Sequence, residues 1–572
     1  VVLAALAYGV YRLTAGRRGG AAPPVASLQN MKLTRLPASG VTHYATVAPD
    51  GRNAARILYE AGRHSVRLRQ LATTSEREIL PPSADHYYLG LTFSPDGDFL
   101  YYVRGKKGES FRELYRVSTL GGDPQKLAFD VDSAVTLSPD GRRFAFRRHA
   151  PKTNEDRLII SDEGGSERTL FSCVRPATLG TPAWSPDGSV VAFTLGGRDE
   201  QGYYVNVEEA AVADGARRTV LSGRWRDIGT LAWLPDGSGL VMNARDRASL
   251  PNTPLQIWHV SYPAGEAQRV TNDLNDYRNL SLTADARTLL AVQTRHTSHL
   301  WVAPGGDASR ARQLTSGGNV GGHDWTPDGR LVYMSDASGN GDIWVMNADG
   351  AGNKQLTFDP NNDTMPSVSP DGRFVAFVSN RAVGWGVWRM DADGSNPKEL
   401  VRNIDRDSFP HWSPDSRYVF YGTRDASGRF ALYRVPAEGG EPALVAAENI
   451  FYAHLSPDGR QFLALTREIE MTAPLRLQVF PAEGGAPAQT LDIPPTIDGP
   501  AWSPDGRAVD YVLTQDGVSN LWRHPLAGGK ARQLTDWKND FINWYSWSRD
   551  GKQLAVSRGT AASEIVLIRD FR

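Results

Sequence analysis

The sequence predicts an all-β protein built from twelve copies of one repeat. The first observation is a Pro-Asp-Gly turn, intact at residues 370–372 and altered at residues 284–286, 414–416 and 549–551. The second is the spacing of the turn aspartates, which recur every 43 to 49 residues. Self-similarity at a period of about 20–50 residues indicates a repeat architecture. The turn aspartates are Asp50, Asp96, Asp140, Asp187, Asp236, Asp285, Asp328, Asp371, Asp415, Asp458, Asp505 and Asp550.

Each turn is predicted to join two strands. Proline presets φ, aspartate accepts local backbone N–H groups and glycine supplies a positive φ. A short apolar strand precedes the turn, and an alternating strand such as Arg373–Val378 follows it. A third run, such as Asp342–Met346, and a fourth ending in Leu-Thr, as at Leu356-Thr357, complete the repeat. Four strands in about 45 residues is the size of a β-propeller blade.

Twelve blades exceed the four to eight that one propeller usually holds. We therefore predict two tandem β-propellers of six four-stranded blades, over residues 29–305 and 306–572. Met31–Leu36 resembles a fourth strand, and His299–Val302 and Glu564–Arg569 resemble third strands. We expect each ring to begin with an outer strand and to close on its own third strand, which removes an exposed edge. A division into five and seven blades stays open.

Composition excludes some partners and chemistry. The chain has 572 residues with 63 basic and 64 acidic side chains, scattered along it, whereas a nucleic-acid surface needs a clustered basic face. No nucleic-acid partner is predicted. Cys173 is the single cysteine, so an intrachain disulfide is impossible, and a buried, inert thiol is expected.

The first residues predict a membrane segment. Val1–Tyr11 is almost entirely apolar and is followed by Arg12, Arg17 and Arg18. Because a spanning helix needs roughly 20 residues, residues 1–15 are interpreted as the end of a transmembrane helix that starts upstream. A signal-peptide remnant or a buried helix is the alternative. Residues 16–28 read as a flexible linker. Taken alone, the arginines would place the following residues in the cytoplasm.

The repeats resemble a known family. The Trp-Ser-Pro-Asp-Gly turns, the Leu-Thr outer strands and the Asp391–Gly394 turn are similar to TolB-type, WD-like β-propeller repeats. Leu28–Thr34 after a membrane segment, then twelve blades ending in Ile565–Phe571, resembles the C-terminal half of membrane-anchored serine/threonine protein kinases of the acidobacterial type. The resemblance implies a single-pass protein of the bacterial inner membrane with periplasmic propellers that act as a sensor. The same region also follows winged-helix domains in CadC-like membrane-bound regulators.

No catalytic, cofactor or metal motif is found. A propeller-bearing serine peptidase needs a Gly-x-Ser-x-Gly elbow on an α/β-hydrolase domain, and neither occurs. Kinase signatures are also missing from this chain. No His-x-x-x-His, Cys-x-x-Cys or EF-hand spacing is present. We therefore predict no enzyme activity for this chain, no cofactor and no metal motif.

Alignment of the repeats gives the first candidate site. The position two residues before the turn serine is small in the first half of the chain. In the second half it includes Asp324 and the neighbouring-blade pair His411 and His454, with His323 beside Asp324. This position lies on the innermost strand, so it predicts a ligand or metal site at the axis of the second propeller. The alternative is that these side chains bond the backbones of adjacent blades.

The second candidate is an acidic mouth. Asp363, Asp407, Asp498 and Asp540 precede innermost strands of the second half, where loops of a rigid scaffold often bind ligands. They would favour cationic or polyhydroxy partners, unless they are ordinary turn residues. The repeating tryptophans, in contrast, are interpreted as packing between blades. Their positions are Trp184, Trp233, Trp325, Trp412, Trp502 and Trp547.

The sequence thus predicts a membrane-tethered, non-catalytic binding protein. Its partner would be a small ligand or an envelope protein. By resemblance it is the sensor part of a serine/threonine kinase, and such a tethered sensor would act as a homodimer. The alternatives are the sensor half of a CadC-like regulator and a TolB-like scaffold that docks envelope proteins.

Overall fold

The computed structural model describes residues 31–571 except 37–39, 61, 74, 108, 110, 176, 200–201, 247–253, 274, 383, 405–407, 425–428, 448–449, 467–474, 495 and 516. These residues are all-β, as predicted, with one short 3-10 helix at Ala308–Arg310 among them. The described part of the chain holds no helix with the length and apolar character needed to cross a bilayer. The predicted membrane segment (1–15) and linker (16–28) lie outside the described residues.

The first sheet group, residues 41–269, contains three four-stranded antiparallel sheets and one of eight strands. In the larger sheet β18 pairs with β17 on one side and with β19 on the other. The strands are β2 (Val41–Val47), β3 (Asn53–Glu60), β4 (Arg63–Gln70), β5 (Glu76–Ser83), β6 (His86–Phe93), β7 (Phe99–Lys106), β8 (Arg112–Ser118), β9 (Gln125–Phe129), β10 (Thr136–Leu137), β11 (Arg143–Ala150), β12 (Glu155–Asp162), β13 (Glu167–Val174), β14 (Thr178–Leu179), β15 (Ala183–Trp184), β16 (Val190–Asp199), β17 (Gly202–Ala211), β18 (Arg217–Trp233), β19 (Gly239–Asp246), β20 (Gln256–Ser261) and β21 (Ala267–Arg269).

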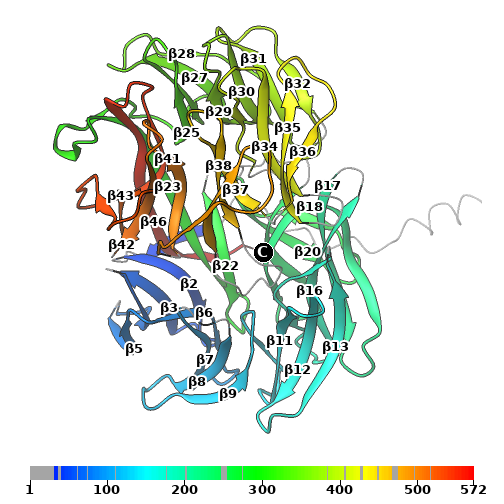
Figure 1. Ribbon diagram of the computed structural model, residues 1–572. Coiled ribbons are helices and arrows are strands. Elements are labelled where there is room, and N and C mark those ends of the chain that lie inside the picture. The colour runs from blue at the N-terminus through cyan, green and yellow to red at the C-terminus, as the bar shows by residue number, and fades with distance from the viewer. Residues whose placement is uncertain are drawn as a thin grey trace, which may run out of the picture.

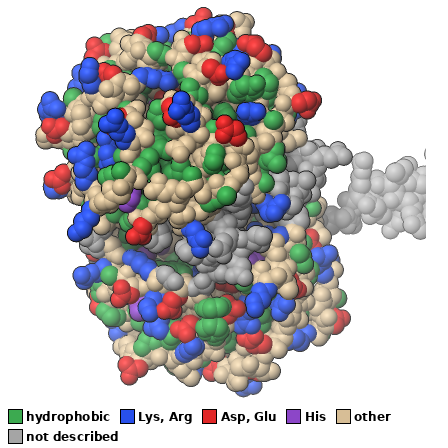
Figure 2. Space-filling model, viewed as in Figure 1, with side chains coloured by type: hydrophobic (Ala, Val, Ile, Leu, Met, Phe, Trp, Pro, Cys, Tyr) green, Lys and Arg blue, Asp and Glu red, His purple; other side chains and the backbone are tan. Residues whose placement is uncertain are grey.

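The second sheet group, residues 320–533, contains five four-stranded antiparallel sheets. It forms the upper part of the molecule in Figure 1, and the first group forms the lower part. Basic and acidic side chains are interspersed over the visible face of both parts (Figure 2). The strands are β25 (Val320–Trp325), β26 (Arg330–Ser335), β27 (Asp342–Asn347), β28 (Lys354–Gln355), β29 (Asp363–Val368), β30 (Phe374–Ser379), β31 (Gly386–Asp391), β32 (Lys398–Val401), β33 (His411–Trp412), β34 (Tyr418–Arg424), β35 (Phe430–Pro436), β36 (Ala443–Ala446), β37 (Ile450–Leu455), β38 (Gln461–Thr466), β39 (Arg476–Pro481), β40 (Gln489–Leu491), β41 (Ile497–Trp502), β42 (Ala508–Gln515), β43 (Val518–Pro525) and β44 (Arg532–Gln533).

The repeated turn is held by its own side chains. The hydroxyl of Ser369 donates to the carboxylate of Asp371 at 2.6 Å, and that carboxylate accepts from the backbone N–H of Arg373 at 3.1 Å. Gly372 takes a φ of 72°, and a Cβ there would lie 3.2 Å from Pro327 of the preceding turn. The turn joins paired strands β29 and β30, as predicted, and its glycine allows close stacking on the neighbouring turn.

The tryptophan series joins neighbouring sheets. The indole N–H of Trp412 donates to the backbone oxygen of Ser367 at 2.9 Å, and that of Trp502 donates to the backbone oxygen of His454 at 2.9 Å. Both indoles are buried. The prediction that these tryptophans pack between blades is confirmed at both positions, because each satisfies its polar N–H inside the protein.

One sheet is shared by both groups. Its longest strands, β23 and β46, pair antiparallel from Thr288 opposite Arg569 to Pro304 opposite Gln553. The first half of β23 pairs with β22 and its second half with β24, while β46 pairs with β45 and then with β1. The chain therefore passes between the groups twice, through two continuous strands where the groups meet (Figure 1). The strands are β1 (Lys32–Leu36), β22 (Asp276–Leu282), β23 (Thr288–Pro304), β24 (Arg312–Gln313), β45 (Phe541–Trp547) and β46 (Gln553–Arg569).

This exchange corrects the predicted closure. The expectation that each half closes on its own third strand is wrong, because β1 pairs with residues 565–569 and not with His299–Val302. Residues 301–302 pair instead with β24, at the start of the second half. The two third strands occupy equivalent places in their repeats, so either one satisfies the same apolar pattern and repeat spacing cannot distinguish them. The predicted domain boundaries, 29–305 and 306–572, divide the chain at a single point. In the structure, residues 565–569 of the second range pair with β1 of the first.

Candidate functional site

The innermost strands surround two cavities. The larger cavity, about 660 Å³, is lined by residues of β25, β29, β33, β37, β41 and β45 and of the segments next to them. The smaller cavity, about 300 Å³, is lined by residues of β2, β6, β10, β15, β18 and β22 and of neighbouring segments. A volume of roughly 300–1,000 Å³ is usual for small-ligand sites.

The aligned position singled out in the sequence lines both cavities in every repeat. Its side chains are small in the smaller cavity and include two imidazoles and a carboxylate in the larger. In the smaller cavity they are Thr46, Thr92, Thr136, Ala183, Ala232 and Ser281. In the larger cavity they are Asp324, Ser367, His411, His454, Ala501 and Ser546.

Bulges on the innermost strands set the direction of these side chains. The pairing of β29 shifts between Thr364 and Ser367, and that of β41 between Asp498 and Ala501. A bulge bends a strand and re-aims the residues beside it. Met365 in the first bulge has a φ of 51°, which is uncommon for a residue other than glycine. Such conformations cluster at binding sites, and Met365 lines the larger cavity.

His411 on β33 and His454 on β37 lie side by side. Their ring centroids are 4.4 Å apart. Burial lowers the pKa of His454 to about 4 and, together with the neighbouring His454, lowers the pKa of His411 well below its usual value. His454 Nδ1 lies 3.1 Å from the backbone oxygen of Leu455, and His411 Nε2 is buried with no hydrogen-bond partner in the described part of the chain. Both imidazoles are therefore neutral at pH 7, and His411 Nε2 has an unused hydrogen-bonding capacity among the described residues.

His323 and Asp324 hold β25 against its neighbours. His323 Nδ1 lies 2.8 Å from the hydroxyl of Ser546, and its backbone oxygen accepts from the indole N–H of Trp544 at 3.0 Å. The carboxylate of Asp324 accepts from the backbone N–H of Val368 at 2.8 Å. These contacts match the alternative interpretation of the sequence, in which the polar side chains at and next to the aligned position form hydrogen bonds to neighbouring repeats.

Of the three predicted loop aspartates that the structure describes, one lines the larger cavity. Asp498 lines it and is exposed. Asp540 lies outside the lining and forms an ion pair with Arg558 at 2.9 Å. Asp407 lies outside the described residues. In the described part of the chain, Asp498 is therefore the one member of the predicted acidic mouth that lines the larger cavity.

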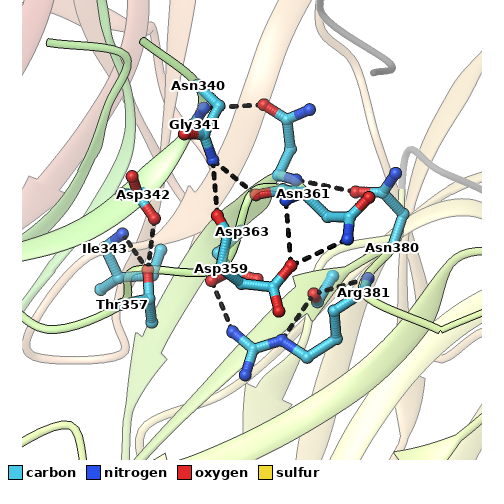
Figure 3. A network of polar contacts seen from close by, with 12 residues as sticks. Asn340, Gly341, Asp342, Ile343, Thr357, Asp359, Asn361, Asp363, Asn380 and Arg381 are labelled. Atoms are coloured by element: carbon cyan, nitrogen blue, oxygen red, sulfur yellow. Dashed lines mark hydrogen bonds and ion pairs between the residues drawn. The ribbon is translucent and has the colours of Figure 1, made fainter. Parts of the chain in front are cut away.

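Asp363 belongs to a polar network between two sheets (Figure 3). It is 0% exposed, and its Oδ2 lies 2.5 Å from Nη2 of Arg381. Burial raises the pKa of Asp363, and the Arg381 charge opposes that rise. Asn362 accepts from the backbone N–H of Gly341 at 2.7 Å, which ties the loop to the neighbouring sheet. Asp363 does not line the larger cavity. Its contacts hold the start of β29 in place.

Sequence reasoning missed three aromatic side chains of the larger cavity, Phe409, Tyr452 and Trp544, here called the aromatic bridge. The rings of Phe409 and Trp544 are 5.4 Å apart and 17° from parallel, and Tyr452 meets Phe409 edge-on at 5.2 Å. Phe409 precedes β33, which contacts β29 and β37, whereas Trp544 lies on β45, which contacts β25 and β43. Because these two strands are not neighbours, the contact between Phe409 and Trp544 spans the cavity.

A signal for the bridge was present in the sequence. Each member lies two residues before the aligned position of its repeat, at His411, His454 or Ser546. Residues two apart on a strand face the same side. The aligned column two positions earlier would therefore have shown that the larger cavity holds two levels of distinctive side chains.

Arg549 stands where the turn has proline in most repeats. It is exposed, lines the larger cavity, and donates through Nη2 to the backbone oxygen of Val368 at 2.9 Å. Burial raises the pKa of Asp324, and the Arg549 charge opposes that rise. The larger cavity thus has a cation at the turn side and the carboxylate of Asp498 at the loop side.

Comparison with known proteins gives a partial family match. Residues 315–401 match the TolB β-propeller domain. This TolB-like segment covers β25 to β32, and so includes His323, Asp324 and Asp363 but ends before His411 and His454.

Curated relatives match parts of the chain. The chain is 26% identical over 206 residues to the uncharacterized peptidase YuxL of Bacillus subtilis, which covers 35% of this chain and 28% of the relative. It is 28% identical over 124 residues to the uncharacterized protein Atu1656 of Agrobacterium fabrum, covering 21% and 39%. The Tol-Pal system protein TolB of Marinomonas sp. is 36% identical over 79 residues, covering 14% and 18%. The matches thus span well under half of each relative.

Solved structures include distant likenesses. The tricorn protease aligns over 90% of this chain and 60% of its own at 11% identity with a TM-score of 0.33. TolB from Acinetobacter baumannii aligns over 63% and 81% at 17% identity with a TM-score of 0.20.

Among the described residues, neither metal-binding side chains nor the cysteine thiol form a second candidate site. Within the described ranges, no group of three or more His, Cys, Asp or Glu side chains is placed to hold a metal ion. Burial, with a smaller contribution from the charge of Asp156, raises the pKa of the Cys173 thiol to about 11. Cys173 is therefore a protonated thiol at pH 7 and a poor nucleophile.

We expect His323 and His454 to make the protein less stable in acid. Burial lowers the pKa of His323 to about 3 and that of His454 to about 4, from 6.5. Above about pH 6.5 both are neutral folded and unfolded, so they add no pH dependence. Below it the unfolded chain binds their protons first, and each histidine should cost about 2 kcal/mol of stability by pH 5.

Urea unfolding at pH 7.5 and pH 5 tests this. His323→Gln and His454→Gln should each lose about 2 kcal/mol less than the parent protein between these pH values. His524→Gln, a partly exposed histidine outside the larger cavity, is the control and should match the parent. Equal losses in all four proteins would show that burial does not hold these imidazoles neutral.

Proposed function

We propose that this chain is a binding protein without chemistry of its own, and that the larger cavity is its ligand site. The contrast between the two cavities carries the proposal. At the aligned position the smaller cavity has hydroxyl and methyl groups. The larger cavity has His411 and His454 there, each two residues after a member of the aromatic bridge. Packing alone does not require this difference, since copies of the same repeat line both cavities. An apolar cavity with a few placed polar groups is the usual form of a small-ligand site.

We further infer that the sheets form two six-bladed propellers joined by the shared sheet. The support is that six innermost strands line each cavity. In the second group β25 contacts both β29 and β45, as the first and last blades of a ring would. In the first group Thr46 Oγ1 lies 2.9 Å from Ser281 Oγ, which joins β2 to β22 in the same way. A division into six and six fits these contacts better than five and seven.

A screen of small aromatic compounds by thermal unfolding tests the ligand site. Compounds that bind the folded chain should raise its Tm. We expect Phe409→Ala and Trp544→Ala each to abolish the rise, because they remove the bridge across the cavity. Tyr44→Phe in the smaller cavity is the matched control and should keep it. Retention of the rise in both alanine variants, or a screen without a binder, would contradict the proposal. His411→Ala and His454→Ala then report whether the imidazoles contact the compound.

We propose that the protein works as the periplasmic sensor part of a membrane-bound serine/threonine kinase, as a homodimer. The support is the apolar run Val1–Tyr11 followed by the twelve repeats, in the order that such kinases show. A CadC-like regulator is the second candidate and a TolB-like scaffold for envelope proteins the third, favoured by the TolB-like segment. Reading the coding sequence upstream of Val1 separates them. A kinase core supports the first, a winged helix the second and a signal sequence alone the third.

A further inference from the structure

We propose that the larger cavity binds an organic ammonium cation between Asp498 and the aromatic bridge. This inference rests on the proposed function of that cavity and names the chemistry of its ligand. It is carried by two observations, the distribution of charge along the cavity and the presence on its lining of three partly exposed aromatic rings together with the exposed carboxylate of Asp498.

The loop side of the cavity carries a negative charge that no basic side chain of the described lining neutralises. Asp498 is exposed, and its Oδ1 accepts from the backbone N–H of Gly499 at 2.8 Å. Among the described lining residues the only Arg or Lys is Arg549, which lies at the turn side and donates to Val368. The imidazoles between the two ends are neutral. Of the charged side chains described on the lining, a cation entering from the loop side therefore meets the attractive Asp498 first.

The other carboxylates near this end are already neutralised or committed. Asp540 pairs with Arg558 and Asp363 pairs with Arg381, both away from the cavity lining. Asp324 lines the cavity, but both of its carboxylate oxygens accept backbone N–H groups, one from Trp325 and one from Val368, each at 2.8 Å. Asp498 is thus the carboxylate, among the described lining residues, that a ligand can reach.

The aromatic bridge supplies the second half of the site. Phe409, Tyr452 and Trp544 all line the cavity and are only partly buried, so their rings can be reached. Burial raises the pKa of Tyr452, and the negative charge of Asp498, which lines the same cavity, adds to that rise. Aromatic faces attract cations within about 6 Å, most strongly when water is excluded.

The bridge is rigid enough to present these faces. The indole N–H of Trp544 donates to the backbone oxygen of His323 at 3.0 Å, which fixes the ring against β25. Phe409 is held between Trp544 and Tyr452, with centroid distances of 5.4 and 5.2 Å. A rigid aromatic wall loses little conformational entropy on binding, so it favours a compact cation over a flexible chain.

Isothermal titration of the full chain with two probes of equal shape tests the charge requirement. Choline carries a trimethylammonium group, and 3,3-dimethylbutan-1-ol has the same shape without the charge. We expect choline to bind at least about tenfold more tightly. Its affinity should fall as salt rises from 20 to 500 mM, because the attraction is screened, while that of the alcohol should not.

Variants then locate the charge and the rings. Asp498→Asn should weaken choline about tenfold and leave the alcohol unchanged, and Asp498→Glu should restore part of the loss. Trp544→Ala should weaken both probes. Asp536→Asn changes an exposed carboxylate outside the cavity and is the matched control with no expected effect. Thermal unfolding of each variant separates lost binding from lost folding.

Three results would overturn the inference: equal affinity for both probes, no effect of Asp498→Asn, or no binding of choline. The first result combined with a loss in Trp544→Ala would leave the larger cavity as a ligand site for neutral compounds. Failure of the cation inference is therefore distinguishable from failure of the proposed function, which the screen with Phe409→Ala and Trp544→Ala decides.

Discussion

Replacing Gly559 with valine is expected to destabilise the whole chain by about 3 kcal/mol or more. Gly559 lies opposite Ser298 on the ladder of β23 and β46, at the point where these strands pass from one sheet group to the other. A Cβ at this position would overlap the backbone oxygen of Thr297. The strands would have to separate, and each sheet group would lose a strand that completes it.

Urea unfolding followed by circular dichroism measures this effect. Gly422→Ala is the matched control, because Gly422 also lies within a strand, β34, and a Cβ there would meet nothing within 4 Å. We expect the control to stay within about 0.5 kcal/mol of the parent protein. Because the two strands belong to both groups, unfolding should remain a single transition. A Gly559→Val protein as stable as the control would show that the strand crossing tolerates a side chain.

Replacing Asp510 with alanine is expected to cost about 3–5 kcal/mol of stability. Asp510 on β42 is 0% exposed, and its carboxylate accepts from Arg523 at 2.6 and 2.7 Å and from the indole N–H of Trp547 at 2.8 Å. Burial raises the pKa of Asp510, whereas hydrogen bonding to Arg523 opposes that rise. The truncation leaves a guanidinium and an indole N–H without their acceptor inside the protein.

A double variant separates the lost charge from lost packing. Asp510→Leu combined with Arg523→Met removes both charges, and we expect it to lose less stability than Asp510→Ala alone. Asp536→Ala removes one partner of an exposed pair with Lys538, and should change stability by less than about 1 kcal/mol. If Asp510→Ala behaved like Asp536→Ala, the pair with Arg523 would contribute nothing to folding.

The regular parts of the fold could be predicted because each depends on a local rule. Ser369 and Gly372 fix a turn through contacts within a few residues, so its recurrence marks the pair formed by the first two strands of each repeat. The pairing of β1 with β46 could not be predicted, because it joins Lys32 to Arg569 and no local pattern distinguishes the two candidate third strands. Local chemistry specifies each sheet, but the choice of partner depends on the whole chain.

The candidate site was predictable to the same limited extent. Alignment found His411 and His454 because the repeat fixes which residues face the centre. It missed Phe409, since aromatic residues are common in β-strands and only their contact across the cavity makes them distinctive. It also grouped Asp363 with Asp498, although Asp363 is buried against Arg381 and Asp498 is exposed. Whether a carboxylate is free or paired depends on residues far along the chain.

The pairing of β1 with residues 565–569 separates the order of synthesis from the order of folding. A nascent chain that has emerged up to β22 already contains the other strands of the first sheet group, yet the sheet between β1 and β22 must wait for residues translated last. Until then β1 and the first half of β23 present unpaired edges. A chaperone that covers these edges during synthesis would therefore act on the N-terminal half, and its release would coincide with arrival of the C-terminal strand.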